Sequence, residues 1–157
     1  SQGADRAGER APAGPAGRFR TGAVTRATAA RRSRVILVEP SVWIDHLRRG
    51  VPELVERLQH NVVLGHPAVI GEVALGHLSG RAEILRLLSA LPPAQVATPA
   101  EVMVLIEDQR LSGQGIGWVD AQLLAATFLT VGATLWTRDN RLSVVAERLR
   151  CVHTQDQ

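Results

Sequence analysis

Four acidic residues lie at positions where carboxylates could act together on one substrate. Glu39 directly follows the apolar run Val35–Val38, and Asp139 follows a second strand-like segment. Asp120 opens an apolar helical segment, and Glu72 lies within another one. In an open parallel sheet, ligands bind beyond the carboxyl ends of the strands, where loops and helix starts converge. We therefore expect these four side chains to face a common site.

Carboxylates that converge on one point repel one another and raise one another's pKa values. A hard divalent cation relieves this repulsion, and Mg²⁺ and Mn²⁺ prefer oxygen ligands. The reaction that suits such a site is phosphodiester hydrolysis, in which the metal activates water and stabilises the leaving oxygen. Spacing alone supports this chemistry only weakly, since each acid could equally be an ordinary helix cap or a surface charge.

The segments that must position these acids alternate between strands and helices. Unbroken apolar runs are typical of strands buried on both faces of a parallel sheet. They predict strands at residues 35–38, 62–64 and 135–137, with shorter ones at 96–97 and 151–152. Helices are predicted from residue 40 onward and at residues 52–59, 69–77, 81–91, 98–111, 121–129 and 142–149. The pattern indicates an α/β sandwich with a mostly parallel central sheet of four or five strands.

The basic charge of the chain lies in its first 33 residues. Residues 1–33 carry seven arginines against two acids, and residues 34–157 carry eleven arginines against thirteen acids. The net charges of these two parts, +5 and −2, sum to the +3 of the whole chain. Because residues 1–33 hold almost no large apolar side chains, we predict a disordered leader rich in Ala, Gly and Arg. This leader is either an arm that attracts RNA or a segment that is not native. A segment of the second kind would have been added to the protein or translated from a start site placed too far upstream. Residues 34–157 are predicted to form one domain.

Cysteine and hydropathy exclude two classes of protein. Cys151 is the only cysteine, so a disulfide-stabilised secreted scaffold is excluded. No apolar run approaches the roughly 18 residues that a membrane-spanning helix needs. We therefore expect a cytoplasmic protein that does not enter a membrane.

The sequences around the four acids resemble the motifs of VapC-type PIN-domain toxins. The first is ILVEPSVWIDHL, residues 36–47, and the second is Gly71-Glu72-Val73. The third is GWVDAQLLAA, residues 117–126, and the fourth is LWTRDNRL, residues 135–142. They occur in the family's order and at its usual separations, and together they cover most of residues 34–152.

The resemblance implies a PIN-like three-layer sandwich with the activity of a Mg²⁺- or Mn²⁺-dependent endoribonuclease toxin. The catalytic residues that it implies are Glu39, Glu72, Asp120 and Asp139, of which Glu39, Asp120 and Asp139 would bind the metal. Ser41 and Thr137 match positions where a hydroxyl orients a neighbouring carboxylate. The implied partners are RNA, a VapB-type antitoxin whose C-terminal segment blocks the site, and a second copy in a homodimer. The helices that follow Glu39 and contain Glu72 would give the antitoxin an apolar groove.

The chain departs from the family at its first acid, where Asp followed by Thr is usual and Glu39-Pro40 is found. The extra methylene extends the carboxylate by roughly 1.5 Å. Either the site works with altered geometry, in which case Glu39→Asp would raise activity, or the chain is an impaired PIN module that binds RNA or protein. A housekeeping PIN ribonuclease without an antitoxin is a further alternative. A phosphatase is less favoured, because the first strand lacks an Asp-x-Asp motif.

Other polar and aromatic residues allow two interpretations each. Arg138 and Arg141 flank the last acid and either bind RNA phosphates or are ordinary loop arginines. Asp45 either assists at the site or, as we favour, is a solvated helix charge. Trp43 and Trp118 are candidates to line an RNA or partner groove, whereas Trp136 is expected in the core. The five histidines show no metal-ligand spacing and are interpreted as surface or hydrogen-bonded residues.

Overall fold

The computed structural model describes residues 34–155, so the predicted leader, residues 1–33, lies outside the described residues. In this range the chain forms three strands, β1 (Val35–Val38), β2 (Val63–Leu64) and β3 (Ala133–Trp136). It also forms seven helices: α3 (Pro40–Arg49), α4 (Pro52–Gln59), α5 (Pro67–Leu75), α6 (Arg81–Ser89), α7 (Pro99–Asp108), α8 (Trp118–Leu129) and α9 (Asn140–Arg148).

The three strands form a parallel sheet in the order β2-β1-β3. Leu37 of β1 pairs with Leu64 of β2 on one side and with Leu135 of β3 on the other. The carboxyl ends of the strands therefore lie at one edge of the sheet, and the residues that follow each strand emerge there together. The predicted α/β class with a parallel sheet is confirmed.

The sheet is smaller than the four or five strands that we predicted. Residues 96–97 form no strand; the chain meets the end of β2 earlier, through a single bridge between Gly65 and Pro93. Consecutive prolines at 92 and 93 lack the N–H groups that a ladder needs, so the pairing stops there. At the other edge, Val152 forms one bridge to Leu135 and no strand follows.

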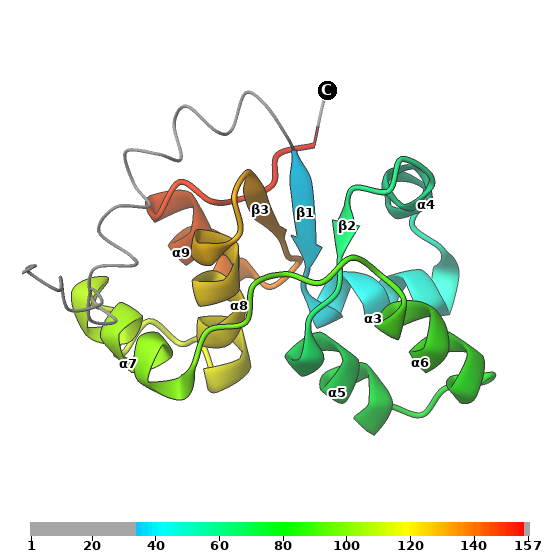
Figure 1. Ribbon diagram of the computed structural model, residues 1–157, viewed down its shortest axis with the longest axis horizontal. Coiled ribbons are helices and arrows are strands. Elements are labelled where there is room, and N and C mark those ends of the chain that lie inside the picture. Colours follow the sequence, from blue (N-terminus) through cyan, green and yellow to red (C-terminus); the bar gives the residue numbers. More distant parts are fainter. Residues whose placement is uncertain (1–33, 156–157) are drawn as a thin grey trace, which may run out of the picture.

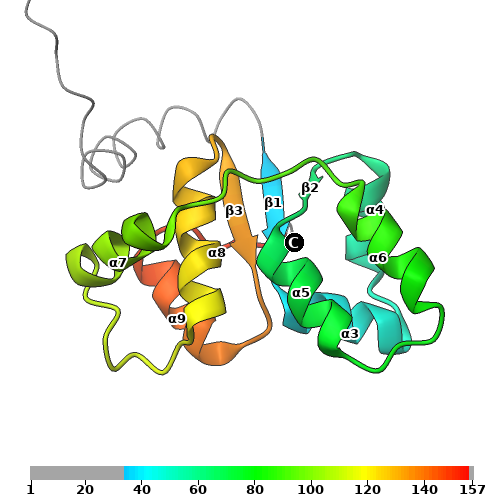
Figure 2. The same ribbon diagram turned by 60° about the horizontal axis from the view of Figure 1, so that its bottom comes forward.

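Helices cover the sheet on both sides (Figures 1 and 2). Helices α7, α8 and α9 gather beside β3, while α3, α4, α5 and α6 gather beside β2. Between them lies the core, which includes Leu37, Leu123, Leu124 and Leu135, all fully buried, and the expected Trp136. Within residues 34–155, no helix is long and apolar enough to cross a membrane.

The predicted helix start at Thr98 is confirmed in detail. The Thr98 hydroxyl accepts from the Glu101 backbone N–H at 3.2 Å, and the Glu101 carboxylate accepts from the Thr98 N–H at 3.0 Å. This reciprocal capping box satisfies two backbone donors that the first turn of a helix leaves unpaired. The helix ends at Asp108, three residues earlier than the sequence indicated.

Candidate active site

Three of the four acids lie at helix starts, and two of these come within three residues of the end of a strand. Glu39 is the N-cap of α3 after β1, and Asp139 is the N-cap of α9, which follows β3. Asp120 lies in the first turn of α8, where its carboxylate accepts from the backbone N–H of Gly117 at 3.1 Å. The partial positive charge at each helix N-terminus stabilises these carboxylates. The fourth acid, Glu72, lies within α5 and is exposed to solvent.

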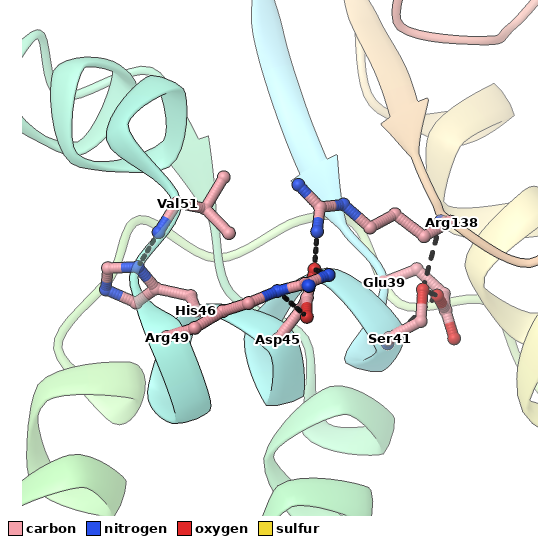
Figure 3. Close-up of polar contacts among 7 residues, drawn as sticks. All are labelled: Glu39, Ser41, Asp45, His46, Arg49, Val51 and Arg138. Atoms are coloured by element: carbon pink, nitrogen blue, oxygen red, sulfur yellow. Dashed lines mark hydrogen bonds and ion pairs between the residues drawn. The ribbon is translucent and has the colours of Figure 1, made fainter.

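The carboxylate of Glu39 is held by three donors on a single oxygen. Its Oε2 accepts from the backbone N–H of Ser41 at 3.0 Å and from the Thr137 hydroxyl at 3.0 Å. The Ser41 hydroxyl donates to the same oxygen (Figure 3). The hydroxyl contacts that the family resemblance implied for Ser41 and Thr137 are therefore present, and both involve Glu39.

The same two hydroxyls also accept hydrogen bonds from the connection between β3 and α9. The backbone N–H of Arg138 donates to Ser41 Oγ at 3.0 Å, and that of Asp139 donates to Thr137 Oγ1 at 3.0 Å. Each hydroxyl thus links the Glu39 carboxylate to the backbone that carries Asp139. The position of Asp139 relative to Glu39 is fixed by hydrogen bonds as well as by the pairing of β1 with β3.

Burial and mutual repulsion shape the electrostatics of the cluster. Burial raises the pKa of Glu39, the bonds from Ser41 and Thr137 lower it, and the charge of Asp120 raises it further. Burial likewise raises the pKa of Asp120, the Gly117 N–H lowers it, and the charges of Asp139 and Glu72 raise it. Asp120 is therefore the member through which all four carboxylates are electrostatically linked.

The chemistry of these donors suits a hard divalent cation. The charge of Asp120 raises the pKa of Glu39, and those of Asp139 and Glu72 raise the pKa of Asp120, so a positive charge placed among these groups would relieve the repulsion. Within residues 34–155, no three His, Cys, Asp or Glu side chains are already gathered as a complete metal-binding group. Mg²⁺ does not require such a group, because it is usually bound by one or two carboxylates with waters and substrate phosphates completing its shell. The residues present fit a cation that is held partly by its substrate.

The two arginines beside the last acid are both held in place. The Arg138 guanidinium forms an ion pair with Asp45 of α3. Arg141 packs over the glycine-rich loop before α8, where a Cβ on Gly115 would lie 2.8 Å from Arg141 Cδ. Residues 113–117 form neither helix nor strand, and Gly113 and Gly115 have positive φ angles.

Asp45 is more buried, and forms more ion pairs, than we expected from the sequence. We favoured a solvated helix charge, yet its side chain is only 17% exposed and contacts two arginines, Arg138 and Arg49. The pairing with Arg49 was readable from the sequence, because residues four apart on a helix are neighbours. The pairing with Arg138 depends on the approach of α3 to the end of β3, for which the sequence carries no local signal.

Of the two tryptophans expected to line a groove, Trp43 differs from its expected role. Trp43 is buried in the core, so it does not line an open groove, whereas Trp118 at the start of α8 is exposed. His66 follows β2 and is buried, with its Nδ1 accepting from the Ala68 N–H at 3.0 Å as the cap of α5. Its Nε2 has no hydrogen-bond partner among the described residues, so this histidine is only half satisfied. Burial lowers the pKa of His66, which keeps the ring neutral and able to cap the helix that carries Glu72.

Comparison with curated proteins identifies two similar chains. This chain is 48% identical over 108 residues to the protein named ribonuclease VapC32 in two strains of Mycobacterium tuberculosis, CDC 1551 and H37Rv. Each alignment covers 69% of this chain and 87% of the relative. No family model matches the chain, and no solved structure matches it.

Proposed function

The chain belongs to the VapC family of ribonucleases, and we propose that it hydrolyses RNA at the cluster formed by Glu39, Glu72, Asp120 and Asp139. Family membership implies a PIN fold, in keeping with the small parallel sheet and its surrounding helices. The observation that supports the proposal is the charge interaction among the acids: Asp120 raises the pKa of Glu39, and Asp139 and Glu72 raise the pKa of Asp120. We infer internal cleavage, hence an endoribonuclease, from the family resemblance.

We propose that Glu39, Asp120 and Asp139 hold Mg²⁺ or Mn²⁺. When bound, the cation supplies Lewis-acid activation of water and stabilisation of the leaving oxygen. Glu39 presents its carboxylate in an orientation fixed by Ser41 and Thr137, so little reorganisation is needed when the substrate arrives. In this proposal Glu72, exposed on α5, would accept the proton that the attacking water releases.

We further propose that the protein is the toxin of a VapBC-like pair and acts in the cytoplasm. A VapB-type antitoxin would cover the site and the neighbouring faces of α3 and α5, which pack against each other. Ile44 on α3 and Leu75 at the end of α5 are exposed apolar side chains available for such a partner. Assembly of the toxin as a homodimer is part of the same proposal.

One alternative is an impaired module that binds RNA without cutting it. The observation that favours this alternative is the presence of Glu39 where the family usually has aspartate. The contacts of Glu39 argue against impairment, because the Ser41 N–H and the Thr137 hydroxyl both reach the longer carboxylate at ordinary hydrogen-bonding distances. A pocket built around the longer side chain can retain its function with glutamate in this position.

The test is cleavage of a total RNA pool by the purified chain with Mn²⁺, with Mg²⁺ and with EDTA. We expect discrete fragments with either metal and none with EDTA, and we expect Glu72→Gln to slow their appearance. Intact RNA under all three conditions would contradict ribonuclease activity. Retention of that RNA on the protein would then favour the binding module.

A further inference from the structure

Beside the acid cluster, one carboxylate on α3 binds two arginines. Arg49 contacts Asp45 with two nitrogens, Nε to Oδ1 at 2.7 Å and Nη2 to Oδ2 at 2.9 Å. The Nη1 of Arg138 also forms an ion pair with Asp45 Oδ2, so both arginines contact this oxygen (Figure 3). We refer to Asp45, Arg49 and Arg138 as the Asp45 cluster.

The Asp45 cluster carries a net charge of +1 that faces outward. Its carboxylate is largely covered, whereas the side chain of Arg49 is 71% exposed and that of Arg138 is 38% exposed. A guanidinium has five N–H donors, so the contacts with Asp45 engage only part of each group. Two partly exposed guanidiniums held beside each other match the oxygens of a phosphate, which arginine binds in a bidentate manner.

The Asp45 cluster lies next to the site where RNA would be cut. The backbone N–H of Arg138 donates to Ser41 Oγ, and the Ser41 hydroxyl in turn contacts Glu39 (Figure 3). A cluster of four carboxylates repels a polyanion, so RNA needs positive charge close to the site to bind there. Residues 34–157 carry a net charge of −2, so within this part of the chain attraction must come from local groups of this kind.

We propose that the Asp45 cluster binds a phosphate of the RNA backbone next to the one that is hydrolysed, and that Asp45 is the positioning residue that holds both arginines ready for it. The proposal rests on the proposed ribonuclease function. By restraining two flexible side chains before RNA arrives, Asp45 lowers the conformational entropy lost on binding.

Substitution of Asp45 separates positioning from simple charge. Asp45→Asn removes a negative charge, so electrostatics alone would make the protein bind RNA more tightly. If Asp45 acts by positioning the arginines, Asp45→Asn will instead bind RNA about fivefold more weakly, and Asp45→Glu will recover part of the affinity. The two explanations therefore predict changes of opposite sign in the RNA affinity of Asp45→Asn.

The experiment measures fluorescence anisotropy of a labelled single-stranded RNA with the full chain in EDTA, over a series of salt concentrations. Arg49→Gln and Arg138→Gln should each weaken binding about fivefold and reduce the salt slope by about 0.7, the value for one phosphate contact on a single strand. The matched control is Arg86→Gln, which removes an exposed arginine that pairs with Glu83 on α6. It should leave affinity and slope close to wild type.

Two results would overturn the proposal. One is unchanged or tighter RNA binding by Asp45→Asn, which would leave the cluster to serve another purpose, such as binding a carboxylate of a protein partner. The other is equal loss in Arg86→Gln and Arg138→Gln, which would indicate unspecific attraction. A parallel cleavage assay of the wild type with Mn²⁺ distinguishes failure of this proposal from failure of the proposed ribonuclease function. If the wild type cleaves RNA while Asp45→Asn binds RNA as tightly as the wild type, only the proposal for the Asp45 cluster is refuted. If the wild type does not cleave RNA, the proposed function itself is refuted.

Discussion

Thr137 and Glu39, 98 positions apart in the chain, are joined by a hydrogen bond of 3.0 Å from the threonine hydroxyl to Glu39 Oε2. The same hydroxyl accepts from the backbone N–H of Asp139 at 3.0 Å. One side chain at the end of β3 therefore orients the first acid and fixes the backbone of the last. Thr137 therefore links Glu39 to Asp139 in the proposed site.

Replacing Thr137 by valine keeps the volume of the side chain and removes both hydrogen bonds. We expect cleavage to fall about tenfold in kcat with little change in KM, because the orientation of Glu39 is lost while RNA contacts remain. Unfolding should become easier by about 1 kcal/mol. Thr137→Ser should recover most of the activity, and Thr134→Val in the preceding strand, β3, is the control. Equal effects at both threonines would indicate a general effect on the strand.

Shortening Glu39 to aspartate tests whether the pocket is built for the longer carboxylate. The family pattern alone suggested a gain in activity, but the contacts of Oε2 favour a loss of about tenfold, since an aspartate cannot reach Thr137 as closely. Stability should change little, because aspartate is itself a good N-cap. Steady-state cleavage by both proteins at saturating Mn²⁺ measures the change. Faster cleavage by the variant would show that Glu39 is a defect.

The raised pKa of Asp120 predicts how stability depends on pH. A carboxyl group with a higher pKa in the folded chain binds its proton more tightly there, so ionisation at rising pH favours unfolding. In metal-free protein at pH 7, Asp120→Asn should therefore raise the melting temperature by a few degrees. The gain should disappear as the pH falls below 3.8, the ordinary pKa of aspartate, where both proteins are neutral at this position.

Added Mn²⁺ should reverse this order, since a ligand that binds only the folded state stabilises it. The wild type should gain melting temperature with increasing Mn²⁺, and Asp120→Asn should gain much less. Scanning calorimetry with and without the metal measures both effects. A wild type that is indifferent to Mn²⁺ at millimolar concentration would argue against a cation among these carboxylates.

Two glycines of the loop before α8 provide a matched pair. Gly113 and Gly115 both have φ angles near +75°, but only Gly115 is covered by a side chain, that of Arg141. Gly113→Ala should therefore cost about 1 kcal/mol from backbone strain alone. Gly115→Ala should cost about 1–2 kcal/mol more, because its Cβ would displace Arg141. Urea denaturation of the two variants gives the difference, and equal costs would show that Arg141 moves aside freely.

The sequence predicted the parts of the fold that depend on local pattern. The apolar run Val35–Val38 became the central strand, and the helix predicted from residue 98 formed with Thr98 as its cap. The strand predicted at residues 96–97 was wrong, because the prolines before it end the pairing. The expectation that Trp43 lines a groove was wrong, because the side of α3 that carries Trp43 packs into the core.

The proposed site was predictable only as a set of positions. Acids after parallel strands were expected to meet, and the motif resemblance added Ser41 and Thr137 as hydroxyl partners. The attachment of Arg138 to Asp45 was not predictable, because it depends on how the β3–α9 connection lies across α3. Contacts between distant segments leave no periodic trace in the sequence.

The measurement that tests the central claim most directly is the initial rate of RNA cleavage as a function of Mn²⁺ concentration for the wild type, Asp120→Asn and Asp108→Asn. Asp108 is an exposed acid at the end of α7, so its substitution removes the same charge away from the proposed site. We expect saturable, Mn²⁺-dependent cleavage by the wild type and by Asp108→Asn, and a rate at least about a hundredfold lower for Asp120→Asn. Equal rates for all three proteins, or cleavage that persists in EDTA, would contradict metal-dependent hydrolysis at the Glu39, Glu72, Asp120 and Asp139 cluster.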